Sequence, residues 1–412
     1  MELKKYRLGD IVDFNKETIS KQDNYLEIKY LDTSSVLDNV ISKTPSMKLA
    51  DAPSRAQRKV GHLTIIYSTV RPRLKHHGIL HMPPENLIVS TGFATLDIKD
   101  CYENMIDATY LYLLLTQSTV TEYLGNIADT AVSAYPSINP SDISALSFIF
   151  PDITIQRKIA SIWTSYDQKI HLNSAINDNL EAMARQLYDY WFVQFDFPNE
   201  KGKPYKSSGG DMVWNEKLKR EIPEGWNVAN VFDELSVQYG FPFSTELFTE
   251  EPTSIPVVRI RDILENSVSA YSEEEVDEKY KLQKQDLLVG MDGNFHMNYW
   301  NDNVSYLNQR SVRLRAKSKS TVSIMQAKYD IAPYIKAKEL RAKGSTVGHL
   351  SDKDLKELFV LVCPNIDFRN KFDSILAEII ENRCEMIELT KQRDELLPLL
   401  MNGQATVNYH LS

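Results

Sequence analysis

Apolar side chains recur with a helical period over a long stretch of the chain, from residue 152 to residue 197. They stand three or four residues apart except across a polar centre at Lys169 and Asn173, which is the heptad pattern of a helix that pairs with another helix. No Pro or Gly lies between Ile153 and Phe197, so we predict one helix of about 40 residues and roughly 60 Å. Its apolar stripe consists of Ile159, Ile162, Tyr166, Ile176, Leu180, Met183 and Leu187.

A second stretch, from residue 365 to residue 402, carries the same pattern 213 residues further along the chain. One member of its stripe is polar, Arg393, and the others are Phe372, Ile375, Ile379, Leu389, Leu396 and Leu400. A long helix with a single apolar stripe needs a partner to bury that stripe. We therefore predict that the two helices pair as a coiled coil, and that their polar centres help to set the register.

Outside these helices the hydrophobic pattern is that of α+β domains. In residues 1–151, short apolar runs predict strands at 26–32, 63–70 and 87–98, the last with a turn at Gly92. A further apolar run predicts a buried helix over 107–116, with Asp107 as its N-cap. Residues 198–225 are rich in Pro, Gly and Ser, which is typical of a connection between domains.

The order of elements in the first domain returns in residues 226–364. Tyr6–Phe14 corresponds to Trp226–Glu234, and the segment beginning at Arg58 corresponds to the one beginning at Lys281. A period of this length indicates a duplicated domain rather than a solenoid. The predicted layout is a domain (1–151), a long helix (152–197), a linker (198–225), a second domain (226–364), a second long helix (365–402) and a tail (403–412).

Composition changes this picture mainly through the distribution of charge. The chain has 412 residues and a net charge of −9, which disfavours nonspecific binding to nucleic acid by the whole surface. Basic residues nevertheless cluster from Arg55 to His77 and from Arg310 to Lys343, whereas acids cluster from Glu246 to Glu278. We expect local positive surfaces, although the alternative that these residues are scattered over solvated faces stays open.

The sequence resembles the specificity subunits (HsdS) of type I restriction-modification systems over nearly its whole length. The resemblance rests on FPDITIQRKIASIWTSYDQKI and NLEAMARQLYDYWFVQFDFP in the first long helix, on WNEKLKREIPEGW before the second domain, and on the closing ELTKQRDELLPLLMNGQ. YGFPFST, PVVRIRDI, LLVGMDGN and LNQR are further matches, while FRNKF at Phe368 departs from the pattern of IQRKI. The order and duplication of these degenerate motifs make the match specific.

The resemblance implies two target recognition domains that each read one half of a split, asymmetric sequence in double-stranded DNA. It also implies that the long helices pack antiparallel as a spacer, and that the chain is a non-catalytic subunit of a cytoplasmic complex. The partners would be two modification (methyltransferase) subunits and, through them, restriction (translocase-nuclease) subunits, with no membrane association. S-adenosylmethionine, ATP and Mg would belong to those partners, with no cofactor in this chain.

We look for DNA contacts among polar residues at junctions of strands and loops, because Arg, Asn and Gln read base edges while Lys and Arg hold phosphates. In the first domain the candidates are Ser68, Thr69, Arg71, Arg73, Lys75, His76, His77, Thr91 and Gly92. In the second they are Asp292, Gly293, Asn294, His296, Asn298, Gln309, Arg310, Lys336, Lys338, Arg341 and Lys343. The alternative for each group is an exposed basic hairpin or helix face without a ligand.

Two other classes of function remain as alternatives. A coiled-coil scaffold without DNA recognition would explain the long helices but not the basic loops. A self-sufficient restriction-modification enzyme would need a [DNS]-P-P-[YFW] motif, and the nearest string, Met82 to Glu85, lacks both its polar and its aromatic member. No phosphate-binding glycine motif is found, and the three cysteines form no CxxC pair, so we predict neither a cofactor cradle nor a metal site.

Overall fold

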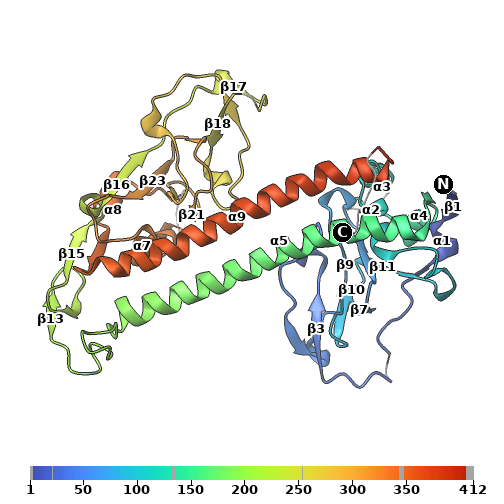
Figure 1. Ribbon diagram of the computed structural model, residues 1–412, viewed down its shortest axis with the longest axis horizontal. Coiled ribbons are helices and arrows are strands. Elements are labelled where there is room, and N and C mark those ends of the chain that lie inside the picture. The colour runs from blue at the N-terminus through green and yellow to red at the C-terminus, as the bar shows by residue number, and fades with distance from the viewer. Residues whose placement is uncertain (1–2, 21, 131–134, 253, 343–347, 405–412) are drawn as a thin grey trace, which may run out of the picture. The chain divides into compact units, whose positions relative to one another are not determined.

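The computed structural model describes residues 3–20, 22–130, 135–252, 254–342 and 348–404. The chain divides into two compact units, which are described separately below. Unit 1 consists of Met1–Gln168 with Lys391–Ser412, and unit 2 consists of Lys169–Thr390. Figure 1 shows the two long helices, α5 (Ile153–Tyr188) and α9 (Ile366–Met401), in green and red. Each unit therefore contains a globular part together with a portion of both helices.

Unit 1 is built on two four-stranded sheets, with strand orders β6-β3-β10-β7 and β2-β11-β8-β9. Two further strand pairs, β1 with β12 and β4 with β5, complete its β structure. The strands are β1 (Lys4–Arg7), β2 (Val12–Phe14), β3 (Glu27–Leu31), β4 (Val36–Leu37), β5 (Val40–Ile41), β6 (Ser46–Lys48), β7 (Ala56–Lys59), β8 (Ile65–Ser68), β9 (His77–Ile79), β10 (Leu87–Ser90), β11 (Phe93–Ile98) and β12 (Ser147–Phe150). All pair antiparallel except β3 with β10.

The helices of unit 1 that precede α5 are α1 (Leu8–Ile11), α2 (Ala108–Leu115), α3 (Ser118–Asp129) and α4 (Pro140–Ser144). Helix α2 begins at the predicted cap, because the side chain of Asp107 accepts a hydrogen bond from the Tyr110 N–H at 2.9 Å. Seven of its eight residues are buried, so it forms the centre of a core that also contains Ile65, Leu96 and Trp163. Burial of this helix on all sides explains its uniformly apolar sequence.

Unit 2 repeats this plan with the sheets β16-β23-β20-β21 and β17-β19-β18-β22 and the pair β15 with β24. Its strands are β13 (Met212–Asn215), β14 (Arg220–Pro223), β15 (Asn227–Asn230), β16 (Leu235–Tyr239), β17 (Phe248–Thr249), β18 (Ile255–Val258), β19 (Tyr271–Ser272), β20 (Leu287–Gly290), β21 (Met297–Tyr299), β22 (Tyr306–Leu307), β23 (Ser311–Ala316) and β24 (Phe359–Val362). The order β16-β23-β20-β21 corresponds to β2-β11-β8-β9 of unit 1. The predicted duplication and the α+β class are therefore both present.

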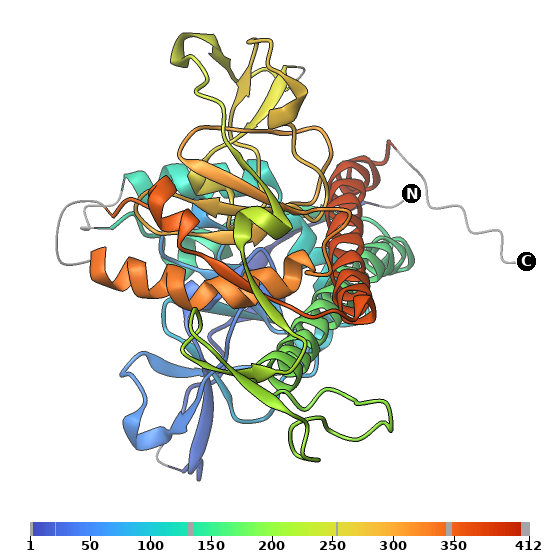
Figure 2. The same cartoon turned by 90° about the vertical axis from the view of Figure 1, so that its left-hand side faces the viewer.

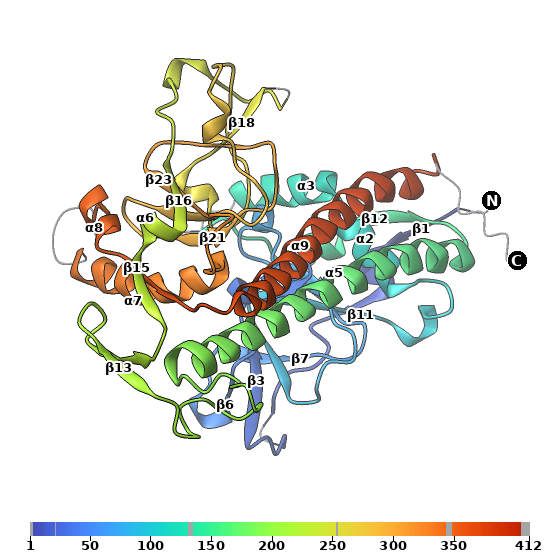
Figure 3. The ribbon, with the colours of Figure 1, turned by 60° about the vertical axis from the view of Figure 1, so that its left-hand side comes forward.

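The helices of unit 2 include α6 (Val231–Glu234), α7 (Ile324–Ala342) and α8 (Asp352–Lys356). Figures 2 and 3 show α7, in orange, beside the sheet of unit 2. Its residues Ile324, Ile331 and Ile335 share a core with Leu287 and Leu314 of that sheet. Where unit 1 uses the two helices α2 and α3, unit 2 thus uses one longer helix in the corresponding part of the sequence.

Both units contain paired segments of α5 and α9. In unit 1, Ile159 and Trp163 of α5 share the core with Leu400 of α9. In unit 2, Asn173 Nδ2 donates to Glu385 Oε2 at 2.7 Å, and Asn382 Nδ2 donates to Asn177 Oδ1 at 2.9 Å. Because residue numbers rise on one helix as they fall on the other, the segments in unit 2 pair antiparallel.

The buried face of α5 differs from the predicted stripe at two positions. Ile176 and Met183 are 36% and 48% exposed, and the residue after each of them, Asn177 or Ala184, is buried instead. Phe372, Ile379 and Leu400 are buried as predicted, and Tyr166 is half-buried. The sequence pattern placed Ile176 and Met183 on this face, whereas Asn177 and Ala184 occupy it, and the Asn177 amide is satisfied by hydrogen bonds with Asn382 and the Ile379 carbonyl. This corrects the prediction for Ile176 and Met183.

The predicted linker contains a β-hairpin in addition to turns. Strands β13 and β14 pair antiparallel between Met212 and Pro223. Before the hairpin, Phe197 stacks on Trp226 with ring centroids 4.9 Å apart, and Trp226 also packs against Phe192 at 5.3 Å. Aromatic packing of this kind fixes the start of the segment against the core of unit 2.

Candidate nucleic-acid interface

In unit 1 the basic segment forms the connection between strands β8 and β9, which we call recognition loop 1 (residues 69–76). Its backbone is tied to the segment that precedes α4. The Arg71 N–H donates to the Pro136 carbonyl at 2.9 Å, and the Ile138 N–H donates to the Thr69 carbonyl at 2.8 Å. Val70 and Ser137 are paired as an isolated antiparallel bridge. The loop therefore has a defined backbone rather than the freedom of an unsupported hairpin.

Two cations of recognition loop 1 are exposed on unusual backbone. Arg71 and Lys75 adopt left-handed conformations, with φ of 49° and 53°, and both are exposed. Between them, residues Pro72–Leu74 form one turn of 3-10 helix. The Arg71 guanidinium lies over the Tyr135 ring, 5.2 Å from its centroid. An arginine stacked on an aromatic ring presents its donors in a plane, the geometry that suits a guanine edge or a phosphate.

Arg73 is in the same loop but turns towards α3. Its guanidinium donates to Glu122 Oε2 at 3.0 Å, to Asp129 Oδ2 at 2.7 Å and to Asn126 Oδ1 at 2.7 Å. Two hydrogen bonds raise the pKa of Arg73. The larger effect comes from Asp129 and the next from Glu122. The guanidinium of Arg73 is thus bound by three acceptors within unit 1, and its role as a DNA contact stays a prediction.

Ser68 and His77, at the two ends of the loop, are each only 1% exposed. The Ser68 hydroxyl donates to the Val70 carbonyl at 2.9 Å. His77 Nδ1 lies 3.0 Å from the Tyr112 hydroxyl, and the imidazole stacks on Tyr67 with centroids 5.6 Å apart. Burial lowers the pKa of His77 to about 4, so its imidazole is neutral near pH 7. Both residues belong to the core, and their predicted role in DNA contact is corrected.

The remaining candidates of unit 1 lie beside the loop. The Thr69 side chain donates to the Gly92 carbonyl at 3.0 Å, and the Thr91 N–H donates to the Arg55 carbonyl at 2.8 Å. His76 is half-buried, with Nδ1 against the Val36 carbonyl. Thr69, Thr91 and Gly92 thus form the edge on which the loop rests, and the exposed cations Arg71 and Lys75 are the best placed for a ligand.

In unit 2 the corresponding connection between β20 and β21 is recognition loop 2 (residues 291–296). It is tied in the same way to the segment before α8: the Gly293 N–H donates to the Gly348 carbonyl at 2.9 Å, and the Leu350 N–H donates to the Met291 carbonyl at 2.7 Å. Asp292 and His349 pair as an isolated antiparallel bridge. The duplicated sequence therefore produces the same backbone support in both units.

The side chains of recognition loop 2 have the opposite arrangement of charge. Asp292 accepts hydrogen bonds from Arg310 Nη1 and from His349 Nδ1, both at 2.6 Å. Burial alone would raise the pKa of Asp292, but these hydrogen bonds outweigh it and lower that pKa. Arg310 has a left-handed backbone with φ of 71° and a side chain that is 64% exposed. It presents a cation at the surface while one of its nitrogens remains bound to the loop.

The other predicted residues of this region divide into exposed and structural groups. Gly293, Asn294 and Gln309 are exposed, and His296 is half-buried. Asn298 is structural, because its amide nitrogen donates to the carbonyls of Ile263 and Leu264 at 3.1 and 2.9 Å. Its side-chain oxygen accepts from the Tyr299 N–H and from Arg383 Nη1. With its amide satisfied inside unit 2, Asn298 is corrected from a DNA contact to a structural residue.

Helix α7 carries Lys and Arg residues, whereas helices α2 and α3 of unit 1 carry none. Lys336 and Arg341, five positions apart in the helix, are both exposed. Lys338 forms an ion pair with Asp354 of α8, which makes it a structural residue and corrects its predicted role. Lys343, the last predicted cation, lies outside the described residues.

The sequence did not identify the residues that support the loops. Glu122, Asn126 and Asp129 lie on α3, a helix that the hydrophobic pattern did not predict, since its polar residues outnumber its buried ones. His349 is 57 positions from Asp292 in the chain, and nothing in a single sequence joins the two.

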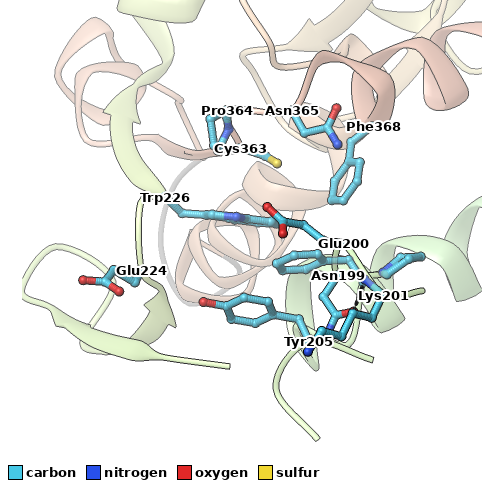
Figure 4. A pocket seen from close by; sticks show the side chains of 12 residues that line it. Asn199, Glu200, Lys201, Tyr205, Glu224, Trp226, Cys363, Pro364, Asn365 and Phe368 are labelled. Carbon is cyan, nitrogen blue, oxygen red and sulfur yellow. Dashed lines mark hydrogen bonds between the residues drawn. The ribbon is translucent and has the colours of Figure 1, made fainter. Parts of the chain in front are cut away.

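A cavity of about 600 Å³ lies at the base of the linker. Figure 4 shows Trp226, Tyr205 and Phe368 around it, with Glu200, Lys201 and Glu224 near its edge. It contains neither a nucleophile paired with a base nor a phosphate-binding loop. Among the described residues no group of three or more His, Cys, Asp or Glu is arranged to hold a metal ion. Within the same part of the chain, no helix has the length and apolarity needed to cross a bilayer.

Comparison with known proteins identifies similar sequences and folds. The family model described as the type I restriction modification DNA specificity domain matches residues 1–182 and 223–398. The HindI specificity subunit of Haemophilus influenzae is 33% identical over 47% of this chain, and the match spans 41% of that protein's length. The MjaIX specificity subunit of Methanocaldococcus jannaschii is 26% identical over 80% of this chain and 76% of its own.

Among solved structures, the S subunit of the type I restriction-modification system of M. genitalium has a similar fold, with a TM-score of 0.56 and 16% sequence identity. The match covers 97% of this chain and 96% of that one. At this identity the likeness concerns the fold, and it agrees with the α+β architecture of two recognition domains and two long helices.

Proposed function

Because the chain belongs to the family of type I restriction-modification specificity subunits, we propose that it reads a split, asymmetric sequence in double-stranded DNA. Each unit would read one half of the target. The observation that carries this proposal is the pair of recognition loops, which have the same backbone support in both units but present different side chains. Equal supports with unequal side chains suit a protein that reads two different half-sites.

Direct reading of bases is proposed for the exposed groups nearest the loops. Arg71 would pair with a base edge or phosphate in one half-site, and Arg310 with Gln309 in the other, since Arg suits guanine and Gln suits adenine. Lys75, Lys336 and Arg341 would hold the DNA backbone. The exposure of these six side chains supports the assignment.

We further propose that the chain works in a cytoplasmic complex with two modification subunits and, through them, with restriction subunits. In this arrangement the chain itself is not an enzyme. Methyl transfer and DNA cleavage, and with them S-adenosylmethionine, ATP and Mg, would belong to the partners. The names of the relatives, which are specificity subunits of type I restriction enzymes, support this division of labour.

Methylome sequencing tests the proposal. A host that expresses the chain with its neighbouring modification subunit is compared with one that lacks only this chain. The expected result is a split N6-methyladenine motif that disappears when the chain is deleted. Unchanged methylation, with the modification subunit present in both strains, would contradict the recognition role.

A scaffold without DNA recognition is the second candidate, favoured by the antiparallel pairing of α5 with α9. The two candidates differ in a DNA-binding measurement with the purified complex. Sequence recognition requires preference for one DNA sequence together with an affinity that falls as salt rises. A complex that assembles fully but binds all DNA sequences equally would identify the scaffold.

If the helices set the distance between the half-sites, their length sets the unread gap. Removing one heptad from both helices shortens each by about 10 Å, or about three base pairs of B-DNA at roughly 3.4 Å each. The methylated motif is expected to keep its bases and to change its gap. An unchanged gap in a folded, active complex would exclude the helices as the spacer.

A further inference from the structure

Arg73 stands out among the cations of recognition loop 1 because its guanidinium is bound by acceptors on the surface of α3. Asp129, Asn126 and Glu122 surround the guanidinium at 2.7, 2.7 and 3.0 Å. These three acceptors, which lie three or four positions apart, share one face of α3. Two carboxylates against one guanidinium leave this spot with a net negative charge. A DNA phosphate would be repelled there rather than attracted.

The position between these acceptors is shaped for the guanidinium. Gly125 lies on the same face of α3, and a Cβ atom added to it would stand 2.7 Å from Arg73 Cζ and 2.8 Å from Arg73 Nε. Real atoms do not approach so closely, so the absence of a side chain at Gly125 is what lets Arg73 lie flat on the helix. The side chain, which is 38% exposed, lies along α3 over Gly125.

The anchor lies at the centre of the loop that presents the exposed cations. Arg73 is two residues from Arg71 and two from Lys75, and both of these residues have left-handed backbone. Such a conformation is uncommon for residues other than Gly, and it persists where the surroundings impose it. The ties between Arg71 and Pro136 hold one side of the loop, and Arg73 is the residue that holds its turn against α3.

We propose that Arg73 is a positioning residue for DNA recognition: by binding the acidic face of α3 it fixes recognition loop 1 in the shape that points Arg71 and Lys75 at the DNA. Arg73 itself does not touch the DNA. This inference rests on the proposed function, since it explains how unit 1 reads its half-site. It goes beyond that function by distinguishing Arg73, which fixes the shape of the loop, from Arg71 and Lys75, which contact the DNA.

The test measures DNA affinity of the complete complex against salt concentration, on the cognate duplex and on a scrambled one. Loss of a phosphate contact reduces the slope of log Kobs against log [salt] by about 0.9. For Arg71→Ala we expect a reduced slope or, if Arg71 reads a base, a relaxed motif at one position. For Arg73→Ala we expect the cognate preference to fall roughly tenfold, the effect of one misplaced bidentate contact, and any fall in the slope to accompany that loss, because Lys75 is displaced as well.

Gly125→Ala displaces Arg73 without changing any charge. Because the atoms that it meets are the far end of a flexible side chain, and because Ala favours a helix, the fold is expected to survive. It should reproduce the effect of Arg73→Ala. Glu122→Gln with Asp129→Asn frees the cation: a positioning role predicts weaker cognate preference, whereas a phosphate contact predicts tighter binding to every sequence.

Arg73→Lys separates the two roles again, because Lys serves a phosphate as a point charge but does not bridge three acceptors. A positioning role predicts that Arg73→Lys loses cognate preference nearly as Arg73→Ala does. The matched control is Arg7→Ala, an exposed arginine on β1, which should change neither slope nor preference. Thermal unfolding of each variant checks that unit 1 remains folded.

The outcomes distinguish this inference from the proposed function. If the unmodified complex shows no cognate preference, the proposed function itself fails. If that preference exists and Arg73→Ala lowers the salt slope by about one while preference is retained, Arg73 is a DNA contact and the inference is overturned. Normal slope and normal preference in Arg73→Ala and Gly125→Ala would also overturn it.

Discussion

Recognition loops 1 and 2 have the same backbone support and opposite side-chain chemistry. In unit 1 a cation of the loop, Arg73, binds acids on α3. In unit 2 an acid of the loop, Asp292, binds Arg310 and the imidazole of His349. The difference shows that the fold requires a fixed loop but not a particular sign of charge. A duplicated domain can therefore change the side chains of its recognition loop while the backbone of the loop stays held in place.

The comparison extends to the helices behind the loops. Unit 2 carries exposed cations on α7, whereas α2 and α3 of unit 1 contain no Lys or Arg. The exposed positive charge of unit 1 near its loop thus lies on the loop itself. If both units bind DNA, unit 1 depends on its loop for both positioning and recognition, and unit 2 divides these tasks between its loop and α7.

Acid should affect the two units in opposite directions, which is the largest difference we expect. The pKa of His77 falls on burial to about 4 from 6.5, so the stability that neutral His77 contributes is present above pH 6.5 and is lost as the pH falls towards 4. The pKa of Asp330 in α7 rises on burial to about 6 from 3.8, so its contribution is greatest at low pH and is lost as the pH rises through 6.

From pH 7 to pH 5 we expect unit 1 to lose about 2 kcal/mol and unit 2 to gain about 1 kcal/mol. Hydrogen exchange of peptides from each unit, corrected for the intrinsic pH dependence of exchange, measures both changes. His77→Gln, which does not titrate, should remove the loss from unit 1 and leave unit 2 unaltered. Parallel changes in the two units would show that other groups control the response to acid.

The polar pair between α5 and α9 in unit 2 gives a second expectation. Asn177→Ala leaves the buried amide of Asn382 without its acceptor, and an unsatisfied buried group costs about 2 kcal/mol. Replacing both residues by Leu removes the need for hydrogen bonds and should be nearly neutral. Urea unfolding of both variants measures the free energy of unfolding. Equal losses for the single and the double change would show that packing, not the amide bond, decides the effect.

Much of the fold followed from the sequence because it depends on pattern rather than on single contacts. The long helices, the duplication and the N-cap Asp107 all arise from local spacing that a single sequence contains. The prediction that Ile176 and Met183 lie on the paired face of α5 was wrong, because hydrophobicity does not reveal that Asn177 has a partner amide on α9. Pairing of polar groups is a property of two segments together.

The candidate site was predictable as a region but not residue by residue. Recognition loop 1 was selected from its basic residues, and recognition loop 2 from its place in the duplicated domain. Arg71, Lys75 and Arg310 are exposed, and their contact with DNA stays a prediction. His77 has the same polarity as its neighbour His76, yet one is buried and the other is half-buried, a distinction that depends on which strand pairs with which. In the sequence Arg73 and Arg71 look alike. They differ in the structure because Arg73 binds α3, and no local sequence pattern predicts that α3 lies beside the loop.

Asp292 provides the counterpart in unit 2 of the anchor at Arg73. Asp292→Ala removes the acceptor of both Arg310 and His349, so we expect the preference for the bases of the second half-site to fall about tenfold, or about 1.4 kcal/mol. Preference for the first half-site should be unaffected. Binding to duplexes mutated in one half-site at a time measures this separation. Glu265→Gln, an exposed acid of the same unit, is the control for the change in charge.

The smallest effect is expected for the backbone contacts of unit 2. Lys336→Gln with Arg341→Gln removes two phosphate contacts, so the salt slope should fall by about 1.8. Affinity should weaken equally for cognate and scrambled DNA, because phosphate contacts carry no sequence information. Lys319→Gln with Lys353→Gln removes the same charge from exposed positions outside α7 and is expected to leave the slope unchanged. Equal slopes for the two double variants would mean that net charge, not the helix, attracts DNA, and unit 2 would then depend on its loop alone, as unit 1 does.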